Sequence, residues 1–256
     1  MILFDSHCHL QDKRLGDDVE RVLERAWKAG VARMVCCAAR FDDWERVKYI
    51  AETVKSVIPS FGIHPWYLDS APEGWLDALQ AQLLSLPSGV GEIGLDFAVE
   101  DADRGRQERF FRAQLKMANA LKRPVSIHCR KAWQRLVEIL KEEGLRCGAV
   151  VHSYSGAAEM APALERAGAY LSFSGAVVRS YNIKGRRSAA AVSADRLLIE
   201  TDSPDFAPPG VSSPVNEPAN IVRIAEAVAH IRHTDTAVLA QQTYDNGMRL
   251  FGSVCT

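Results

Sequence analysis

The sequence lacks the features that mark several classes of protein. Its six cysteines form no C-x-x-C pair, which argues against a disulfide framework and against a cysteine-ligated zinc site. Neither charge sign dominates, because 31 Lys and Arg stand against 32 Asp and Glu, so a basic field that clamps long nucleic acid is not expected. No apolar run approaches the ~18 residues that span a bilayer, and Met1–Leu10 shows no signal-peptide pattern. These absences predict a cytoplasmic protein without a membrane partner.

The composition is that of a globular protein with a large core. The chain has 256 residues, of which 47% are hydrophobic, and a domain of this size buries roughly 70–75% of its unfolded surface. There is no low-complexity tract, no composition shift and no linker, although Ala207–Pro218 is rich in proline. We therefore expect one domain over residues 1–256.

Short apolar runs recur along the chain every few tens of residues and predict eight strands. They are Ile2–Phe4, Ala32–Cys37, Val57–Ile63, Val90–Leu95, Val125–His128, Ala149–His152, Ala169–Phe173 and Leu197–Ile199. Segments with apolar residues at helical spacing separate or follow them. The predicted helices are Val19–Trp27, Asp43–Ser56, Trp75–Leu86, Gly105–Leu121, Ala132–Glu143, Ala157–Ala167, Pro218–Ile231 and Thr234–Phe251.

Strands that alternate with helices, and that are apolar on both faces, predict a parallel sheet covered by helices. Two architectures compete, a doubly wound open sheet and a closed barrel. The open sheet would have fewer strands or a phosphate-binding glycine turn. Gly89–Gly94 spells G-x-G-x-x-G, but it is itself a strand and an acidic loop follows it. We therefore expect an α/β fold, a (β/α)₈ barrel of the TIM type.

Ionisable side chains gather where the predicted strands end, which is where barrel enzymes place their active sites. His7 and His9 point the same way because side chains alternate along a strand. The other strand-end residues of this kind are Glu92, His128, His152 and Asp202. A single histidine at such a place is more often a core residue, but six residues of ligand type at one end of five strands are hard to attribute to chance. Imidazole and carboxylate suit first-row divalent metals, and six ligands suggest two ions.

Eight strings in this sequence resemble the TatD family of metal-dependent deoxyribonucleases, which belongs to the amidohydrolase superfamily. They are Phe4-Asp-Ser-His7-Cys-His9-Leu, Gly62-Ile-His64-Pro65, Gly91-Glu92-Ile-Gly-Leu-Asp96, Pro124-Val-Ser-Ile-His128-Cys-Arg130, His152-Ser-Tyr-Ser-Gly156, Glu200-Thr-Asp202-Ser-Pro204, Asn216-Glu217-Pro218 and Asn246-Gly-Met-Arg-Leu-Phe251-Gly. The resemblance runs in order from residue 4 to residue 252. It implies a (β/α)₈ barrel, a divalent-metal site and hydrolysis of DNA phosphodiester bonds from the 3′ end.

The resemblance also implies roles for single residues. His7, His9 and Asp202 would bind one metal ion and His128 and His152 a second, with Glu92 bridging the two. His64 would lie near the scissile phosphate, and Arg130 is placed to contact the substrate. Asp202, Glu92 and His64 would thus be the catalytic residues, with His64 and Arg130 binding substrate.

These roles predict a mechanism that uses two divalent ions, Mg²⁺, Mn²⁺ or Zn²⁺. Two such ions and two carboxylates leave a net charge of about +2, which suits a phosphodiester. A hydroxide activated by the two metals would attack phosphorus while Asp202 holds or takes its proton. His64 and Arg130 would steady the non-bridging oxygens.

The expected substrate is single-stranded DNA or a chain end, because the surface is nearly neutral overall and the site is deep. Trp66 and Tyr67 follow His64 closely and are placed to stack an unpaired base. Asp205 stands where the family often has an aromatic or aliphatic residue. Its carboxylate would either repel a phosphate or bind a base.

Two other functions compete with the nuclease. Another hydrolase of the amidohydrolase superfamily, acting on an amide, ester or aminoacyl bond, would use the same metal-activated hydroxide, and the family-specific strings argue against it. A scaffold that had lost its activity would have damaged ligands, whereas all six are present. The sequence specifies neither the metal nor the oligomeric state.

Overall fold

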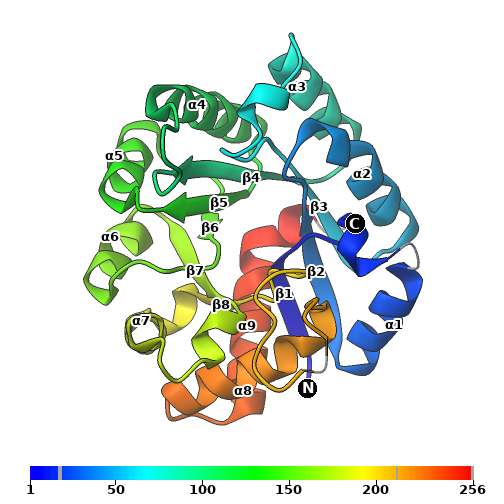
Figure 1. Ribbon diagram of the computed structural model, residues 1–256, viewed down its shortest axis with the longest axis vertical. Coiled ribbons are helices and arrows are strands. Elements are labelled where there is room, and N and C mark those ends of the chain that lie inside the picture. Colours follow the sequence, from blue (N-terminus) through cyan, green and yellow to red (C-terminus); the bar gives the residue numbers. More distant parts are fainter. Residues whose placement is uncertain (17–18, 212, 255–256) are drawn as a thin grey trace.

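Eight parallel strands form one sheet in the order in which they occur along the chain (Figure 1). The computed structural model describes residues 1–16, 19–211 and 213–254. The strands are β1 (Leu3–Cys8), β2 (Val31–Cys37), β3 (Val57–Phe61), β4 (Gly89–Asp96), β5 (Val125–Arg130), β6 (Ala149–Val151), β7 (Ala169–Phe173) and β8 (Leu197–Ile199). Nearly every residue in them is buried, as expected of strands packed on both faces.

Helices surround the strands on the outside (Figure 1). They are α1 (Val19–Lys28), α2 (Trp44–Thr53), α3 (Trp75–Ser85), α4 (Arg104–Leu121), α5 (Trp133–Glu143), α6 (Ala161–Arg166), α7 (Ile183–Ala191), α8 (Ile221–Ile231) and α9 (Thr236–Phe251). Asp103 and Asp235 cap α4 and α9 by accepting hydrogen bonds from backbone amides of the first turn.

Backbone hydrogen bonds join the chain after β8 to β1 and close the ring. The amide of Asp202 donates to the carbonyl of His7 at 2.9 Å, and the amide of His9 donates to the carbonyl of Ser203 at 2.8 Å. The predicted TIM-type barrel is therefore confirmed, and the open doubly wound sheet is excluded. The closing bonds also bring His7, His9 and Asp202 together.

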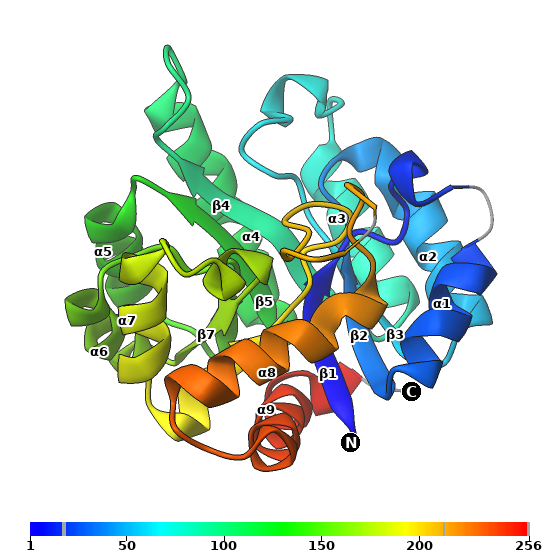
Figure 2. The same ribbon diagram turned by 60° about the horizontal axis from the view of Figure 1, so that its bottom comes forward.

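Helix α9 covers the amino-terminal opening of the barrel, below β1 in Figure 2. Its residues Leu250 and Phe251 belong to one buried cluster with Phe4 and Leu198 from the barrel strands. The rings of Phe4 and Phe251 stack with centroids 6.1 Å apart. This end of the barrel is therefore filled by side chains, whereas a cavity opens at the carboxyl end.

The structure differs from the sequence prediction in two places that bear on the site. Helix α7 was missed because it buries Gly185, Ser188 and Ala189, which are too small to give an apolar pattern. Glu92 was expected near the end of its strand but lies in the middle of β4, so it projects from within the barrel wall. In the described part of the chain, no helix is both long enough and apolar enough to cross a membrane.

Candidate metal centre

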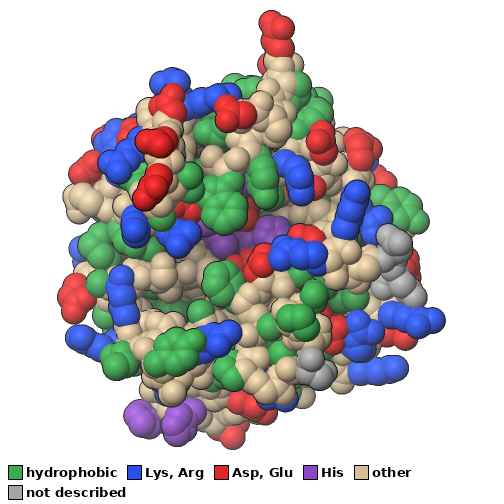
Figure 3. All heavy atoms as spheres, viewed as in Figure 1, with side chains coloured by type: hydrophobic (Ala, Val, Ile, Leu, Met, Phe, Trp, Pro, Cys, Tyr) green, Lys and Arg blue, Asp and Glu red, His purple; other side chains and the backbone are tan. Residues whose placement is uncertain are grey.

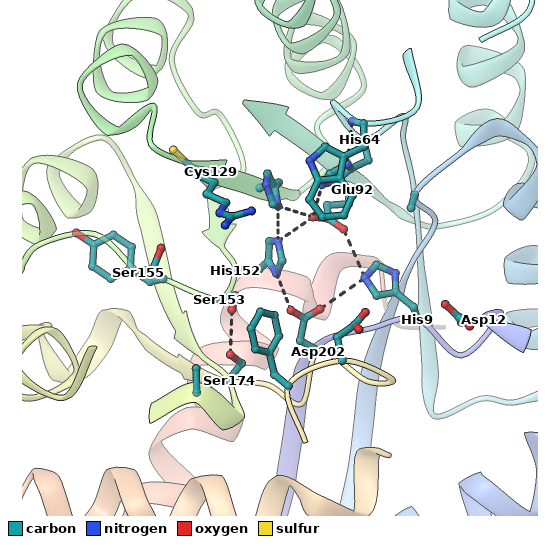
Figure 4. Close-up of a pocket in the computed structure, with 18 of the residues that line it drawn as sticks. His9, Asp12, His64, Glu92, Cys129, His152, Ser153, Ser155, Ser174 and Asp202 are labelled. Atoms are coloured by element: carbon teal, nitrogen blue, oxygen red, sulfur yellow. Dashed lines mark hydrogen bonds and ion pairs between the residues drawn. The ribbon is translucent and has the colours of Figure 1, made fainter. Parts of the chain in front are cut away.

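The strand-end residues of ligand type meet at the carboxyl end of the barrel, at a cavity of about 1050 Å³. Histidine side chains show through an opening near the middle of the face in Figure 3, with hydrophobic and basic side chains around it. In Figure 4, His9, His64, Glu92, His152 and Asp202 point toward one another. The structure therefore brings together all six predicted metal ligands and His64.

Glu92 lies at the centre of this cluster, and its two carboxylate oxygens face different imidazoles. Oε2 lies 3.4 Å from His7 Nε2 and 3.5 Å from His9 Nε2. Oε1 faces His152 Nε2 at 2.8 Å, His128 Nδ1 at 3.0 Å and His64 Nε2 at 3.3 Å. One carboxylate thus connects two groups of nitrogen atoms.

Asp202 is the second carboxylate of the cluster. Its Oδ1 lies 3.6 Å from His9 Nε2 and 3.9 Å from His7 Nε2. Burial alone would raise the pKa of this group, but the hydrogen bond from His9 and the charges of His152 and His7 lower it to about 2. Burial likewise opposes ionisation of Glu92, yet the surrounding histidines hold its pKa well below the usual range. The lowered pKa values of both groups favour the ionised carboxylates beside positive charge.

Hydrogen bonds to the far side of each ring orient three of the histidines for metal binding. His9 Nδ1 donates to the Cys37 carbonyl at 2.7 Å, and His128 Nε2 donates to Asp96 Oδ2 at 3.1 Å. His7 Nδ1 lies 2.8 Å from the hydroxyl of Ser126. When the far nitrogen carries the proton, the nitrogen facing the cavity has a free lone pair. The donor set therefore fits divalent metal ions.

His64 is oriented the opposite way. Its Nδ1 accepts a hydrogen bond from the backbone amide of Trp66 at 3.1 Å, so in the neutral ring the proton lies on Nε2, toward the cavity. Burial is the main reason that the pKa of His64 falls to about 4, which favours this neutral form. His64 therefore faces Glu92 as a hydrogen-bond donor, unlike the three histidines above.

Comparison with known proteins identifies the family. The model of the family described as TatD related DNase matches residues 4–252. The chain belongs to this family. It is thus a metal-dependent hydrolase of the TatD type, as the sequence strings predicted.

Individual relatives match over nearly their whole length. The chain is 32% identical to the "uncharacterized metal-dependent hydrolase YabD" of Bacillus subtilis, covering 98% of this chain and 99% of that one. It is also 32% identical, with the same coverage, to the "3'-5' ssDNA/RNA exonuclease TatD" of Shigella flexneri. The crystal structure of the TatD homologue YjjV from Escherichia coli superposes with a TM-score of 0.93 at 30% identity, covering 98% of each chain.

Sequence reasoning gave no role to three residues that lie next to histidines of the TatD-type cluster. Asp96 accepts from His128, Ser126 contacts His7, and Glu200 Oε1 lies 3.5 Å from His152 Nδ1. Asp96 and Glu200 were detectable as acidic residues at strand ends within the family strings. Ser126 lies within a strand and gave no such signal.

Two arginines lie at the rim of the cavity and differ in their ion pairing. Arg14 is bound on both sides, because it pairs with Asp12 and makes bonds of 2.8 and 2.9 Å to the two oxygens of Asp205. The carboxylate of Asp205, whose role the sequence analysis left open, thus shares Arg14 with Asp12. Arg130 lines the cavity, is exposed, and forms no ion pair with the residues that the structure describes.

Proposed function

We propose that the chain is a divalent-metal-dependent nuclease that hydrolyses DNA phosphodiester bonds from the 3′ end of single strands. The observation that carries this proposal is the cluster of imidazoles and charged carboxylates beneath a cavity that an unpaired arginine, Arg130, also lines. The Shigella relative, named as a 3′–5′ exonuclease on single-stranded DNA and RNA, supports it. We propose further that residues 1–256 act as one hydrolase domain.

The same cluster supports a two-ion centre of Mg²⁺, Mn²⁺ or Zn²⁺. His7, His9 and Asp202 would hold one ion, and His128 and His152 the other, with Glu92 shared between them. The division of imidazoles between the two oxygens of Glu92 supports this assignment. When bound, such ions polarise the phosphate and lower the pKa of a bound water.

The protein side chains supply proton transfer and positioning. Asp202 is held ionised and is placed to accept the proton of the attacking water. His64 presents its Nε2 proton to the cavity and would donate it in a hydrogen bond to a non-bridging phosphate oxygen. Arg130 is the last residue of β5, two positions after His128, and would bind the same phosphate or the next one.

The burial of the cluster supports an unpaired strand or a chain end as substrate. Glu92, His152 and Asp202 are each no more than 5% exposed, so a scissile phosphate must enter the cavity to reach them. A duplex presents its phosphates on a wide cylinder, whereas a single strand or a frayed end can enter.

We also propose a reducing, cytoplasmic location, supported by the five free thiols of the described cysteines; Cys255 lies outside the described residues.

Digestion of a single-stranded oligonucleotide tests the proposed function directly. Metal-stripped protein is supplied with Mg²⁺, Mn²⁺ or Zn²⁺, and products from 5′-labelled and 3′-labelled strands are resolved by length. We expect a metal-dependent ladder of 5′-labelled products and immediate release of the 3′ label as a mononucleotide. Protein that binds metal but leaves both strands intact would contradict the proposal and favour a hydrolase of amide, ester or aminoacyl bonds.

The substitution Arg130→Ala tests whether the unpaired arginine contacts substrate. A charged hydrogen bond contributes roughly 1.5–3 kcal/mol, so we expect KM for single-stranded DNA to rise roughly 10-fold or more. Arg187→Ala is the matched control, since Arg187 is exposed, lies 3.7 Å from Glu159 and does not line the cavity. Equal KM values for the two variants would show that Arg130 makes no substrate contact.

A further inference from the structure

Trp66 uses both of its N–H donors in hydrogen bonds, while about half of its surface is open to solvent. It lies in the loop after β3 and lines the cavity, yet 54% of its surface is exposed. Its indole Nε1 donates to Asp96 Oδ2 at 2.8 Å, and its backbone amide donates to His64 Nδ1 at 3.1 Å. A large apolar ring fixed in this way in contact with water suggests a binding surface.

The bond to Asp96 links Trp66 to the metal cluster. The same oxygen of Asp96 accepts from His128 Nε2 at 3.1 Å, and His128 Nδ1 in turn faces Glu92. The indole centroid lies 6.1 Å from that of His128 and 4.9 Å from that of His64. The orientation of the ring is therefore fixed relative to the atoms that would hold the scissile phosphate.

The neighbouring Tyr67 does not offer a comparable surface. Its ring is partly buried, and the guanidinium of Arg40 lies over it, 5.1 Å from the centroid. The sequence placed both aromatic residues as candidates for stacking, but the structure favours Trp66 alone. A rigid indole also loses little conformational entropy when a flat ligand packs on it.

We propose that Trp66 stacks on the unpaired base of the terminal nucleotide. This inference rests on the proposed nuclease function and adds a subsite for the base to it. Because every base has an aromatic face, stacking tolerates all four bases. The subsite would therefore hold the strand end without selecting its sequence.

The test compares two single-stranded oligonucleotides that differ only in whether the 3′-terminal nucleotide carries its base. For the wild-type enzyme, we expect KM to be roughly 10-fold higher for the abasic end, the size of effect that removal of one stacking contact gives. Trp66→Ala should raise KM for the normal end by a similar factor and abolish the discrimination. Trp66→Phe should keep most of it. Both variants lack the bond to Asp96, so their difference isolates the ring.

Tyr49→Ala is the matched control, because Tyr49 is an exposed aromatic residue on α2 that does not line the cavity. It should discriminate between the two ends as the wild type does. Equal KM values for both ends in the wild type, or discrimination retained in Trp66→Ala, would overturn the proposal. If the wild type cleaves neither strand, the nuclease proposal fails by itself. The affinities of the two oligonucleotides are then compared by fluorescence anisotropy. Weaker binding of the abasic end by the wild type but not by Trp66→Ala supports the stacking subsite, and the same weaker binding in Trp66→Ala overturns the proposal.

Discussion

Substitution of Glu92 by glutamine is expected to reduce kcat/KM for single-stranded DNA by about 10³-fold or more. The amide keeps the shape of the carboxylate but replaces one oxygen by an NH₂ group, which only donates hydrogen bonds. Glu92 uses both oxygens, one toward His7 and His9 and the other toward His128, His152 and His64. The variant should therefore also lose bound metal, measured by mass spectrometry of the dialysed protein.

Glu108→Gln is the matched control for this prediction. It makes the same chemical change on α4, where Glu108 pairs with Arg135 at the surface. A partly exposed pair of this kind contributes about 1 kcal/mol or less to stability, so metal content and kcat/KM should stay within about 2-fold of the wild type. A Glu92→Gln enzyme that matched this control would refute the shared-ligand assignment.

The barrel was predictable because its determinants are repeated along the chain. The eight strands are short, nearly all of their residues are buried, and helical spacing separates them everywhere except between β7 and β8, so each one could be recognised from its own composition. Helix α7 escaped because its buried residues, among them Ser188 and Ala189, are small. The helix packs against the loop after β6, where Ser188 Oγ donates to the Gly156 carbonyl, and no local pattern encodes that contact.

The composition of the metal cluster was also predictable, but its hydrogen bonding was not. Strand ends in a parallel barrel converge whatever the sequence, so the ligand types alone indicated a metal site. Which nitrogen of a histidine faces the cavity depends on distant partners, such as Cys37 for His9 and Asp96 for His128. These hydrogen bonds leave a lone pair on the cavity-facing nitrogens of His9 and His128, whereas that of His64 carries a proton. The spacing of residues along the chain cannot predict this difference.

The pairing of charges at the cavity rim was likewise not predictable from the sequence. Arg14 and Asp205 are 191 positions apart and meet because the loops after β1 and β8 are neighbours in a closed barrel. From the sequence alone, the carboxylate of Asp205 had no partner, which suggested that it either repels a phosphate or binds a base. Once the ring is closed, Arg14 lies between Asp205 and Asp12, so the charge of Asp205 is offset in part by an arginine that it shares with a second carboxylate.

The close approach of β4 to β5 beside the cluster predicts that Gly94→Ala will be strongly destabilising. Gly94 pairs with His128 across the two strands at φ +151°, and an added Cβ would lie 1.9 Å from the His128 carbonyl oxygen. The strands must separate, which should cost more than about 3 kcal/mol and lower the melting temperature by roughly 10 °C. Gly74→Ala is the control, because Gly74 has left-handed backbone angles (φ +74°, ψ 12°) and no atom lies within 4 Å of the new Cβ, leaving only about 1–2 kcal/mol of backbone strain. Equal shifts in thermal unfolding for the two variants would contradict this account. A larger shift for Gly94→Ala, together with reduced metal content, would show that the spacing of β4 and β5 also positions His128.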